Sequence, residues 1–355
     1  MCILPKVNSP AVIKWFGEHA VVYGKPFIGV AVGLYASAVS TDGGEKDLSI
    51  SLADFDLNAS FDSDRMELLY KSRKSTTSIG EFISANSDID QRVLPFALIA
   101  SRIIKGYGVK LGHKTVGVSS EIPVQRGLAS SAACSTSFAV ALSDGHGLSD
   151  NEIIDISREG ERVVHRNDGA GIVDVNTSYY GGCITYSNDL GIRKVKINEN
   201  FNKCDLLLID TGPKKSTAEM VAKVRSLYDS DRVNTEKVFN EIERYVDSGL
   251  EAIISGNVEK VGELMLKNHI ALSRIGVSTP KLDDAVALAK KSGAFGAKMS
   301  GGGGGGLAVA LVSKPHTGKV KLALEDGGFK VSVAPISLHG SSEYNTGSKA
   351  DHGGQ

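Results

Sequence analysis

The sequence predicts a soluble protein of two domains in which β-strands and α-helices are both abundant. The chain has 355 residues, whereas one domain holds roughly 150. Hydrophobic residues make up 41% of the chain and charged residues 23%, as is usual for a globular protein. Strand-like runs mark the first part of the chain, and the second half is mostly helical. We expect the domains to cover residues 1–195 and 196–338, divided within the polar stretch 187–203.

β-Branched and aromatic runs predict the strands of the first domain. Residues 10–40 hold two such runs, which flank Gly17 and Gly24, so we expect a strand, a tight turn and a second strand. Residues 114–122 alternate as a strand does, until Pro123 interrupts the pattern.

Two helices and a strand are expected to complete this domain. The small-residue run from Ser130 contains neither proline nor internal glycine and predicts a buried helix. Ser149 and Glu152 form a capping box, which predicts a helix over residues 150–165. Residues 179–186 are expected to form a strand.

The second domain is expected to be mostly helical. Thr279 followed by Pro280 starts one helix, and Gly293 ends it. The predicted strands are 206–209, 294–299, 307–312 and 331–336, and the other predicted helices are 217–227, 234–247, 249–255 and 257–272. Residues 339–355 lack apolar content, so we expect a disordered tail there.

Charge and cysteine content exclude several classes of function. With 40 basic and 41 acidic residues, the chain has no general field to attract nucleic acid. Its four cysteines are too far apart for a zinc pair and too few for a disulfide framework, which favours a reduced, cytoplasmic setting. No stretch reaches the roughly 18 apolar residues of a membrane span. The eight histidines form no HxH or HExxH pair, so no transition-metal site is expected.

Glycine is unusually frequent, at 40 residues, and two glycine segments have chemical interest. The first is residues 123–133, PVQRGLASSAA, which join a predicted strand to a predicted helix. The free N–H groups and the dipole at a helix start favour an anion, and Gly127 would let the backbone approach a phosphate closely. A capped tight turn is the structural alternative.

The second glycine segment is residues 298–307, KMSGGGGGGL, which hold six glycines between two predicted strands. Such a run indicates a place where side chains do not fit. A flexible linker is the alternative here.

A third segment, residues 161–182, carries two carboxylates. Glu161 ends a predicted helix, and Asp174 follows a glycine-bearing loop. A phosphoryl transferase needs a metal on the phosphates and a group that accepts the hydroxyl proton, and these carboxylates suit those roles. From this segment alone, a structural role stays open.

Together these segments resemble the GHMP kinase superfamily, over residues 8–338. FGEHAVVYGKP is similar to the first motif of mevalonate kinases, above all the archaeal type, GLASSAA to the phosphate-binding motif, and KMSGGGGGGL to the C-terminal glycine motif. The resemblance implies a two-domain α+β fold. Its N-terminal domain would be like domain 2 of ribosomal protein S5, its C-terminal domain would be ferredoxin-like, and ATP would lie between them.

The resemblance also implies roles for individual residues. Asp174 would take the proton of the attacking hydroxyl with Lys14 nearby, and Ser131 and Glu161 would hold Mg²⁺. The implied ATP-binding residues are Gly127, Leu128, Ala129, Ser130, Ser131 and Ala132. The implied acceptor-binding residues are Glu18, His19, Thr211, Ser300, Gly301, Gly302 and Gly303.

Two departures from the family pattern bear on these roles. Mevalonate kinases usually have a lysine six residues before Glu18, where this chain has Val12. Lys14 lies two residues later, which in a strand is the same face, so we expect its side chain to reach the site. AVIKWFG and GLASSA also resemble diphosphomevalonate decarboxylase, a relative of the same fold.

Additional charged residues leave two interpretations open. Arg126 replaces a small residue of the phosphate motif, and the loop before Asp174 is two residues longer than the family pattern. The added basic residues are Arg126, Arg166, Lys214 and Lys215. They are either surface charges or ligands for a phosphate already on the acceptor, since arginine suits bidentate phosphate recognition.

We therefore expect an ATP- and Mg²⁺-dependent kinase of the mevalonate pathway. Its acceptor would be the 5-hydroxyl of mevalonate or of a phosphorylated mevalonate, as in a mevalonate 3-phosphate 5-kinase or a phosphomevalonate kinase. The alternatives are a decarboxylase of this fold, a sugar or homoserine kinase, and a non-catalytic nucleotide-binding regulator. The expected partners are ATP and a small-molecule acceptor, without nucleic acid or membrane, and a homodimer is compatible with the family.

Overall fold

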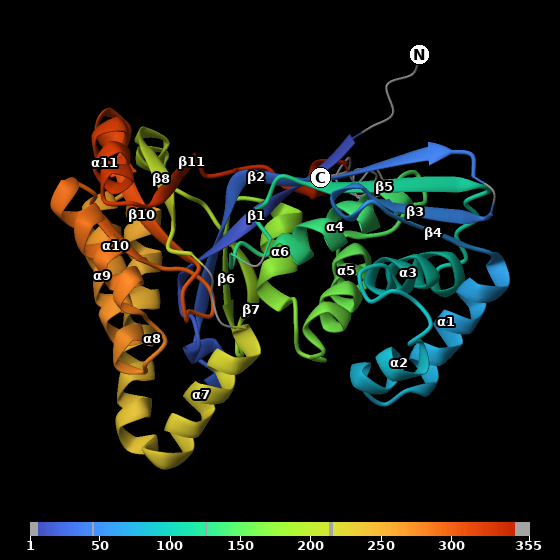
Figure 1. Ribbon diagram of the computed structural model, residues 1–355, viewed down its shortest axis with the longest axis horizontal. Helices are drawn as coiled ribbons and strands as arrows, with labels where there is room; N and C mark the ends of the chain where they lie inside the picture. Colours follow the sequence, from blue (N-terminus) through green and yellow to red (C-terminus); the bar gives the residue numbers. More distant parts are fainter. Residues whose placement is uncertain (1–5, 45, 125, 213–215, 345–355) are drawn as a thin grey trace, which may run out of the picture.

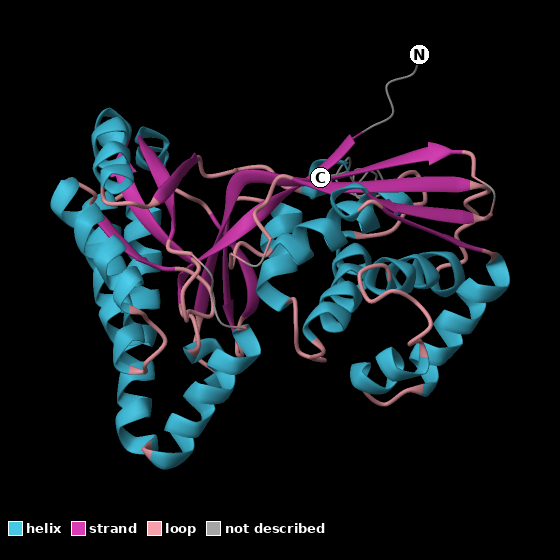
Figure 2. Ribbon diagram, viewed as in Figure 1, coloured by secondary structure: helices cyan, strands magenta, loops and turns pink. Residues whose placement is uncertain are grey.

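The chain forms two lobes, each built on one β-sheet (Figure 1). The computed structural model describes residues 6–344 except 45, 125 and 213–215. The first sheet has seven strands and the second has four, and helices pack on both (Figure 2). This arrangement confirms the predicted α+β class with two sheets.

The N-terminal sheet leaves one edge of its first strand facing the other lobe. Its strands are β1 (Lys6–Phe16), β2 (Phe27–Asp42), β3 (Leu48–Leu52), β4 (Leu57–Phe61), β5 (Lys114–Ser120), β6 (Cys183–Ser187) and β7 (Gly191–Val195). They are ordered β4-β3-β5-β2-β6-β7, and β1 pairs with β2 outside this path. Residues 36–39 of β2 bond β1 on one side and β5 on the other, so the far edge of β1 is open to other contacts.

Six α-helices of the N-terminal lobe accompany this sheet. They are α1 (Ser63–Ser75), α2 (Ile79–Ala85), α3 (Leu94–Ser101), α4 (Ser130–Ser143), α5 (Asp150–His165) and α6 (Ile172–Tyr180). Helix α4 is central, because it packs against β1, β2, α5 and α6. The capping box of Ser149 and Glu152 forms as predicted. The predicted strand 179–186 begins too early, because α6 continues to Tyr180 before Gly181 ends it.

The C-terminal sheet is antiparallel, in the order β11-β8-β10-β9. Its strands are β8 (Cys204–Asp210), β9 (Gly296–Met299), β10 (Leu307–Ser313) and β11 (Lys330–Ala334). Its helices are α7 (Thr217–Ser230), α8 (Arg232–Ser255), α9 (Val258–Arg274), α10 (Pro280–Ser292) and α11 (Lys314–Asp326). None of the helices in the described part of the chain is long and apolar enough to cross a membrane.

The two helices predicted at 234–247 and 249–255 are one helix, α8. Gly249 lies inside it, and a Cβ there would meet the ring of Phe16 at 2.9 Å. This glycine therefore allows α8 to approach β1 closely, at a cost of roughly 1 kcal/mol in helix propensity.

A continuous apolar core joins the two lobes. Buried Ile13 and Trp15 of β1 belong to the same cluster as Leu208 of β8, Val246 of α8 and Met265 of α9. Burial of apolar surface contributes roughly 25 cal/mol per Å². This shared core holds the edge of β1 at a fixed place against the C-terminal lobe.

The chain returns to the N-terminal lobe after β11. The N–H of Ser337 donates to the carbonyl of Ala31, and the carbonyl of Ser337 accepts from Gly182. Residues 341–344 form a short 3₁₀ helix in which Ser341 is fully buried. The prediction of a disordered tail is therefore wrong for residues 339–344, because this segment packs on α4 and α6 and Tyr344 contacts the hydrophobic core. Residues 345–355 lie outside the described part.

Candidate active site

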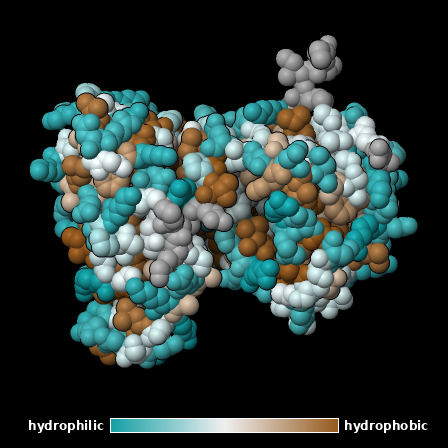
Figure 3. All heavy atoms as spheres, in the orientation of Figure 1, coloured by the Kyte–Doolittle hydropathy of each residue, from teal (hydrophilic) through white to brown (hydrophobic). Residues whose placement is uncertain are grey.

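The two glycine segments meet at the open edge of β1. The N–H of Val12 donates to the carbonyl of Leu128 at 3.0 Å, and the N–H of Lys14 donates to Oγ of Ser300 at 3.3 Å. A Cβ added at Gly127 would lie 3.2 Å from the carbonyl oxygen of Ser300. The edge of β1 thus aligns both segments between the lobes. Figure 3 shows the two lobes as separate masses with a notch between them.

The first segment presents free donors at the start of α4. Ala129 precedes this helix in the left-handed conformation, with φ of 54°, and no side chain caps the helix. The hydroxyl of Ser131 has no hydrogen bond to any described residue. Uncapped N–H groups and the positive end of the helix dipole favour an anion here.

The second segment is packed rather than flexible. Gly303 has φ of +80°, and a Cβ there would lie 2.2 Å from the carbonyl oxygen of Val277. That oxygen accepts a 2.8 Å hydrogen bond from Gly304 N–H. Gly301 packs against the first glycine segment, because a Cβ at Gly301 would lie 3.2 Å from Cα of Gly127. These contacts reject the linker alternative.

Lys14 and Asp174 form an ion pair in which both side chains are partly exposed. The ammonium of Lys14 lies 2.7 and 2.9 Å from the two carboxylate oxygens of Asp174, and the side chains are 23% and 22% exposed. Asp174 is in the first turn of α6. The β1–β2 register is regular from Val12, opposite Ala31, to Lys14, opposite Gly29, so the side chains of Val12 and Lys14 lie on the same face of the strand. Lys14 thus reaches the position that the sequence suggested.

Glu161, the predicted metal ligand, has one unused oxygen. Its side chain is 1% exposed, and Oε2 lies 3.3 Å from Nε2 of His165. The other oxygen, Oε1, is buried without a hydrogen-bond partner in the described part of the chain. The hydrogen bond to Glu161 raises the pKa of His165, and burial of the ring opposes that rise. The negative charge of Asp174 also raises the pKa of His165, and the positive charge of Lys14 lowers it.

An orphaned carboxylate oxygen beside a phosphate site fits a hard cation such as Mg²⁺. Mg²⁺ prefers oxygen ligands and keeps several from water and substrate phosphates. Glu161 and Ser131 would supply the protein ligands. The described residues contain no group of three or more His, Cys, Asp or Glu that could hold a metal, so this site would depend on the nucleotide for further ligands.

A second lysine–carboxylate pair lies in the interior. Lys298 of β9 is 1% exposed and pairs with Glu18, which is also 1% exposed by its side chain. Asn268 of α9 donates to the other Glu18 oxygen at 3.2 Å. Burial lowers the pKa of Lys298, and the Glu18 carboxylate opposes that effect. Both oxygens of Glu18 are therefore engaged by the protein, although the resemblance implied that this residue meets the acceptor.

The other predicted acceptor residues surround the glycine run. Nε2 of His19 is 2.9 Å from the carbonyl oxygen of Gly302. Burial lowers the pKa of His19, which keeps the ring neutral with one N–H to donate. Thr211 uses its N–H and hydroxyl to bond the carbonyl of Gly306, at 2.8 and 2.9 Å. His19 and Thr211 thus hold the run at both ends.

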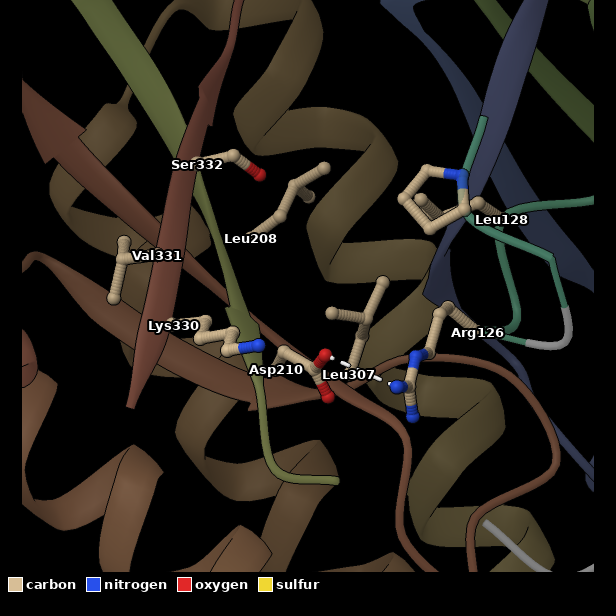
Figure 4. A pocket seen from close by; sticks show the side chains of 9 residues that line it. Arg126, Leu128, Leu208, Asp210, Leu307, Lys330, Val331 and Ser332 are labelled. Atoms are coloured by element: carbon tan, nitrogen blue, oxygen red, sulfur yellow. Dashed lines mark ion pairs between the residues drawn. The ribbon is translucent and has the colours of Figure 1, made fainter. Parts of the chain in front are cut away.

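The added basic residues do not converge on one place. Arg126 pairs with Asp210 at 3.2 Å and donates to the carbonyl of Gly212 at 2.5 Å. Arg126 and Asp210 line a cavity of about 190 Å³, and Lys330 lines it beside their ion pair (Figure 4). Arg166 is exposed at the end of α5 and has no ion pair with any described residue. Lys214 and Lys215 lie outside the described residues.

The sequence interpretation missed Lys298 and Asn268. A signal was present for the first, because a lysine interrupts the apolar strand before the glycine run, and a buried lysine requires partners. Asn268 gave no such signal, since a single asparagine on an amphipathic helix is commonplace.

Comparisons with known proteins agree with the fold. Residues 96–182 match the GHMP kinases N terminal domain, and residues 250–330 match GHMP kinases C terminal. The chain is 31% identical to the mevalonate kinase of Thermococcus sibiricus, over 94% of this chain and 96% of that one. It is 30% identical to the mevalonate kinase of Methanocaldococcus jannaschii, over 87% and 92%.

A solved structure supports the same relationship. The crystal structure of the Methanococcus jannaschii mevalonate kinase superposes with a TM-score of 0.78 at 26% identity, covering 94% of this chain and 99% of that one. Fold and site together define a phosphotransferase that uses an alcohol group as acceptor. The chain belongs to the GHMP kinase family, whose members use ATP, and it is similar to the mevalonate kinases in particular.

Proposed function

We propose that this protein transfers the γ-phosphoryl group of ATP to the 5-hydroxyl of mevalonate. The observation that carries the proposal is the ion pair of Lys14 and Asp174, partly exposed next to the two glycine segments. The names of the archaeal relatives support this choice of acceptor.

Asp174 is suited to act as the base. Its carboxylate takes the proton of the 5-hydroxyl as the hydroxyl oxygen forms a bond to the γ-phosphorus. The bond from that phosphorus to the bridging oxygen of ADP breaks in the same displacement. The Lys14 ammonium orients the carboxylate by holding both of its oxygens, and its positive charge offsets charge that develops on the transferred group.

The first glycine segment is suited to bind the phosphates of ATP. Gly127 and Ala129 turn the backbone so that the first N–H groups of α4 face an anion. When bound to Glu161 and Ser131, Mg²⁺ would neutralise charge on the phosphates. The second glycine segment covers the first without side chains between them, which excludes water from the phosphates.

Charge pairing favours an acceptor without a phosphate. Among the described residues, Lys14, Lys298 and Arg126 are three cations in or beside the glycine segments, and each of these three is paired with a carboxylate. A phosphorylated acceptor would have to displace one of these carboxylates. Of the other added basic residues, Arg166 is exposed at the end of α5, and Lys214 and Lys215 lie outside the described residues.

An ADP-release assay with four acceptors tests the proposal. Mevalonate, mevalonate 3-phosphate, mevalonate 5-phosphate and homoserine are compared side by side at saturating ATP and Mg²⁺. We expect kcat/KM for mevalonate to exceed the others at least about 100-fold, which corresponds to about 2.7 kcal/mol of discrimination. Preference for a phosphorylated mevalonate would refute the choice of acceptor, and release of CO₂ would identify a decarboxylase instead.

A further inference from the structure

The backbone of Lys14 is held by the C-terminal lobe at both of its polar groups. Its N–H donates to Oγ of Ser300 at 3.3 Å, and its carbonyl accepts from Nζ of Lys298 at 3.1 Å. Both partners belong to β9 or to the turn that follows it. The position of Lys14 along the edge of β1 is therefore set by the segment that also begins the glycine run.

The ammonium of Lys298 has all of its donors satisfied. An ammonium has three N–H donors, and Nζ of Lys298 bonds the carboxylate of Glu18, the carbonyl of Lys14 and the carbonyl of Met299. These acceptors come from β1, from the turn after β1 and from β9. Because all three bonds are made inside a buried site, the side chain has one defined geometry.

Helix α9 supports this arrangement with two consecutive residues. Asn268 donates to Glu18, and Nδ1 of His269 accepts from the N–H of Met299 at 3.2 Å. Nε2 of His269 lies 3.0 Å from Asp283 of α10. Helix α9 thus holds both the carboxylate of Glu18 and the backbone of β9 next to Lys298.

Stability alone gives a weak reason for such a buried ion pair. A buried pair is often no more stabilising than apolar residues of similar volume, because desolvation offsets the attraction. What an apolar pair could not supply is a donor for the Lys14 carbonyl. The bond from Lys298 to Lys14 is therefore the part of the network that bears on the reacting groups.

We propose that Lys298 is a positioning residue for phosphoryl transfer, which holds the backbone of Lys14 so that its ammonium meets Asp174. Glu18 and Asn268 act one step further away, because they fix Lys298. This inference rests on the proposed roles of Lys14 and Asp174. It assigns Glu18 to the support of the site rather than to contact with the acceptor.

Three variants and a control separate positioning from stability. Lys298→Met removes the ammonium and leaves Glu18 without its partner, so it is expected to be less stable. The double variant Glu18→Gln, Lys298→Met removes both charges and restores much of the melting temperature. Asn268→Ala is a milder change that keeps the ion pair. Lys319→Met, at an exposed position of α11, is the matched control.

The readout is the division of effects between kcat and KM at a temperature where every variant is folded. We expect the double variant to lower kcat about 10- to 100-fold, as a misplacement of about 1 Å does, with both KM values within about threefold of the native ones. Asn268→Ala should lower kcat by a smaller factor in the same direction, and the control should match the native enzyme. A stable double variant with native kcat would overturn the inference.

The assay keeps this inference apart from the proposed function. All variants are measured with the acceptor that the native enzyme uses best, and results are expressed relative to native kcat. Failure of mevalonate as a substrate would refute the proposed acceptor and leave the Lys298 test intact. A rise in KM with unchanged kcat would show that Lys298 serves binding, and would refute positioning.

Discussion

The two sides of the site contain the same kinds of chemical group but expose them to solvent to different degrees. The open side consists of Lys14, Asp174, Glu161 and Ser131, and the closed side consists of Glu18, Lys298, His269 and the run Gly301–Gly306. Each side contains a lysine–carboxylate pair, but the open pair is 23% and 22% exposed and the closed pair is 1% and 1% exposed.

Hydrogen-bond satisfaction differs between individual groups. Among the described residues, Oε1 of Glu161 and Oδ1 of Asn268 are buried without a partner, whereas the ammonium of Lys298 has three acceptors. Unmet capacity at a buried group costs free energy until a ligand fills it. The comparison teaches that residue type does not distinguish the two lysine–carboxylate pairs, whereas the exposure of their side chains does.

The largest expected effect is on the open side. Asp174→Asn should lower kcat by about 10²- to 10⁴-fold, because the amide cannot accept the hydroxyl proton. ATP affinity, measured by calorimetry, should stay within about threefold, since the phosphate segment is untouched. Asp189→Asn, at an exposed turn between β6 and β7, is the control. Near-native turnover in Asp174→Asn would mean that another group is the base.

On the closed side, the largest expected effect is on stability. Gly303→Ala would place a Cβ 2.2 Å from the Val277 carbonyl oxygen at a φ of +80°. We expect a loss of at least about 3 kcal/mol, measured by urea unfolding. Gly108→Ala is the matched control, because Gly108 also has a positive φ but no atom within 4 Å of its Cβ position. That variant should lose only about 1–2 kcal/mol. Equal losses would show that strain alone, without the packing, decides the cost.

Glu161→Gln returns to the open side with an intermediate effect. The neutral amide is a poorer ligand for a divalent cation, so the Mg²⁺ concentration for half-maximal rate should rise about 10- to 100-fold. The melting temperature without nucleotide should not fall, because a buried charge with an unpaired oxygen has been removed. Glu251→Gln, exposed on α8, serves as the control. An unchanged Mg²⁺ requirement would exclude Glu161 as a ligand.

The smallest expected effect is the pH dependence of the closed side. Burial lowers the pKa of both His19 and His269 from the ordinary value of 6.5. The unfolded chain therefore binds protons that the folded chain does not, so this stability is complete above pH 6.5 and is lost as the pH falls below it. The loss is at most about 1.4 kcal/mol per histidine for each pH unit.

Thermal unfolding between pH 8 and pH 5.5 measures this loss. His269→Gln should make the curve less steep below pH 6.5, and His316→Gln, at an exposed site on α11, should leave it unchanged. A slope that His269→Gln does not alter would assign the dependence to other groups.

Much of the open side could be predicted from the sequence, because its residues belong to short motifs. Asp174, Glu161 and the start of α4 lie where the motifs suggested, and Lys14 lies beside Asp174 despite its shift by two positions. The strand period explains this success, since residues two apart face the same way. The assigned roles of these residues remain predictions.

The closed side could not be predicted, because its contacts join segments that are distant in the chain. The ion pair of Lys298 and Glu18 spans 280 residues, and the bond from Asn268 to Glu18 spans 250. Gly249 shows the same limit in the fold, since two separate helices were predicted around it, whereas it lies inside α8 and allows that helix to approach Phe16. Local patterns contain no information on such partners, and tertiary packing decides them.

The return of residues 335–344 to the first lobe has a consequence for biosynthesis. Ser337 pairs with Ala31 and Gly182, and the backbone at His339 and Gly340 packs directly on Gly181. The first lobe therefore cannot be completed before residues 335–344 have been made, although N-terminal domains generally fold first during synthesis. A ribosome that stalls after β11, or a premature stop codon near residue 334, would give a chain that contains the strands of both sheets but lacks residues 335–344. The resulting defect would lie in the first lobe, which is the part of the enzyme that is translated first.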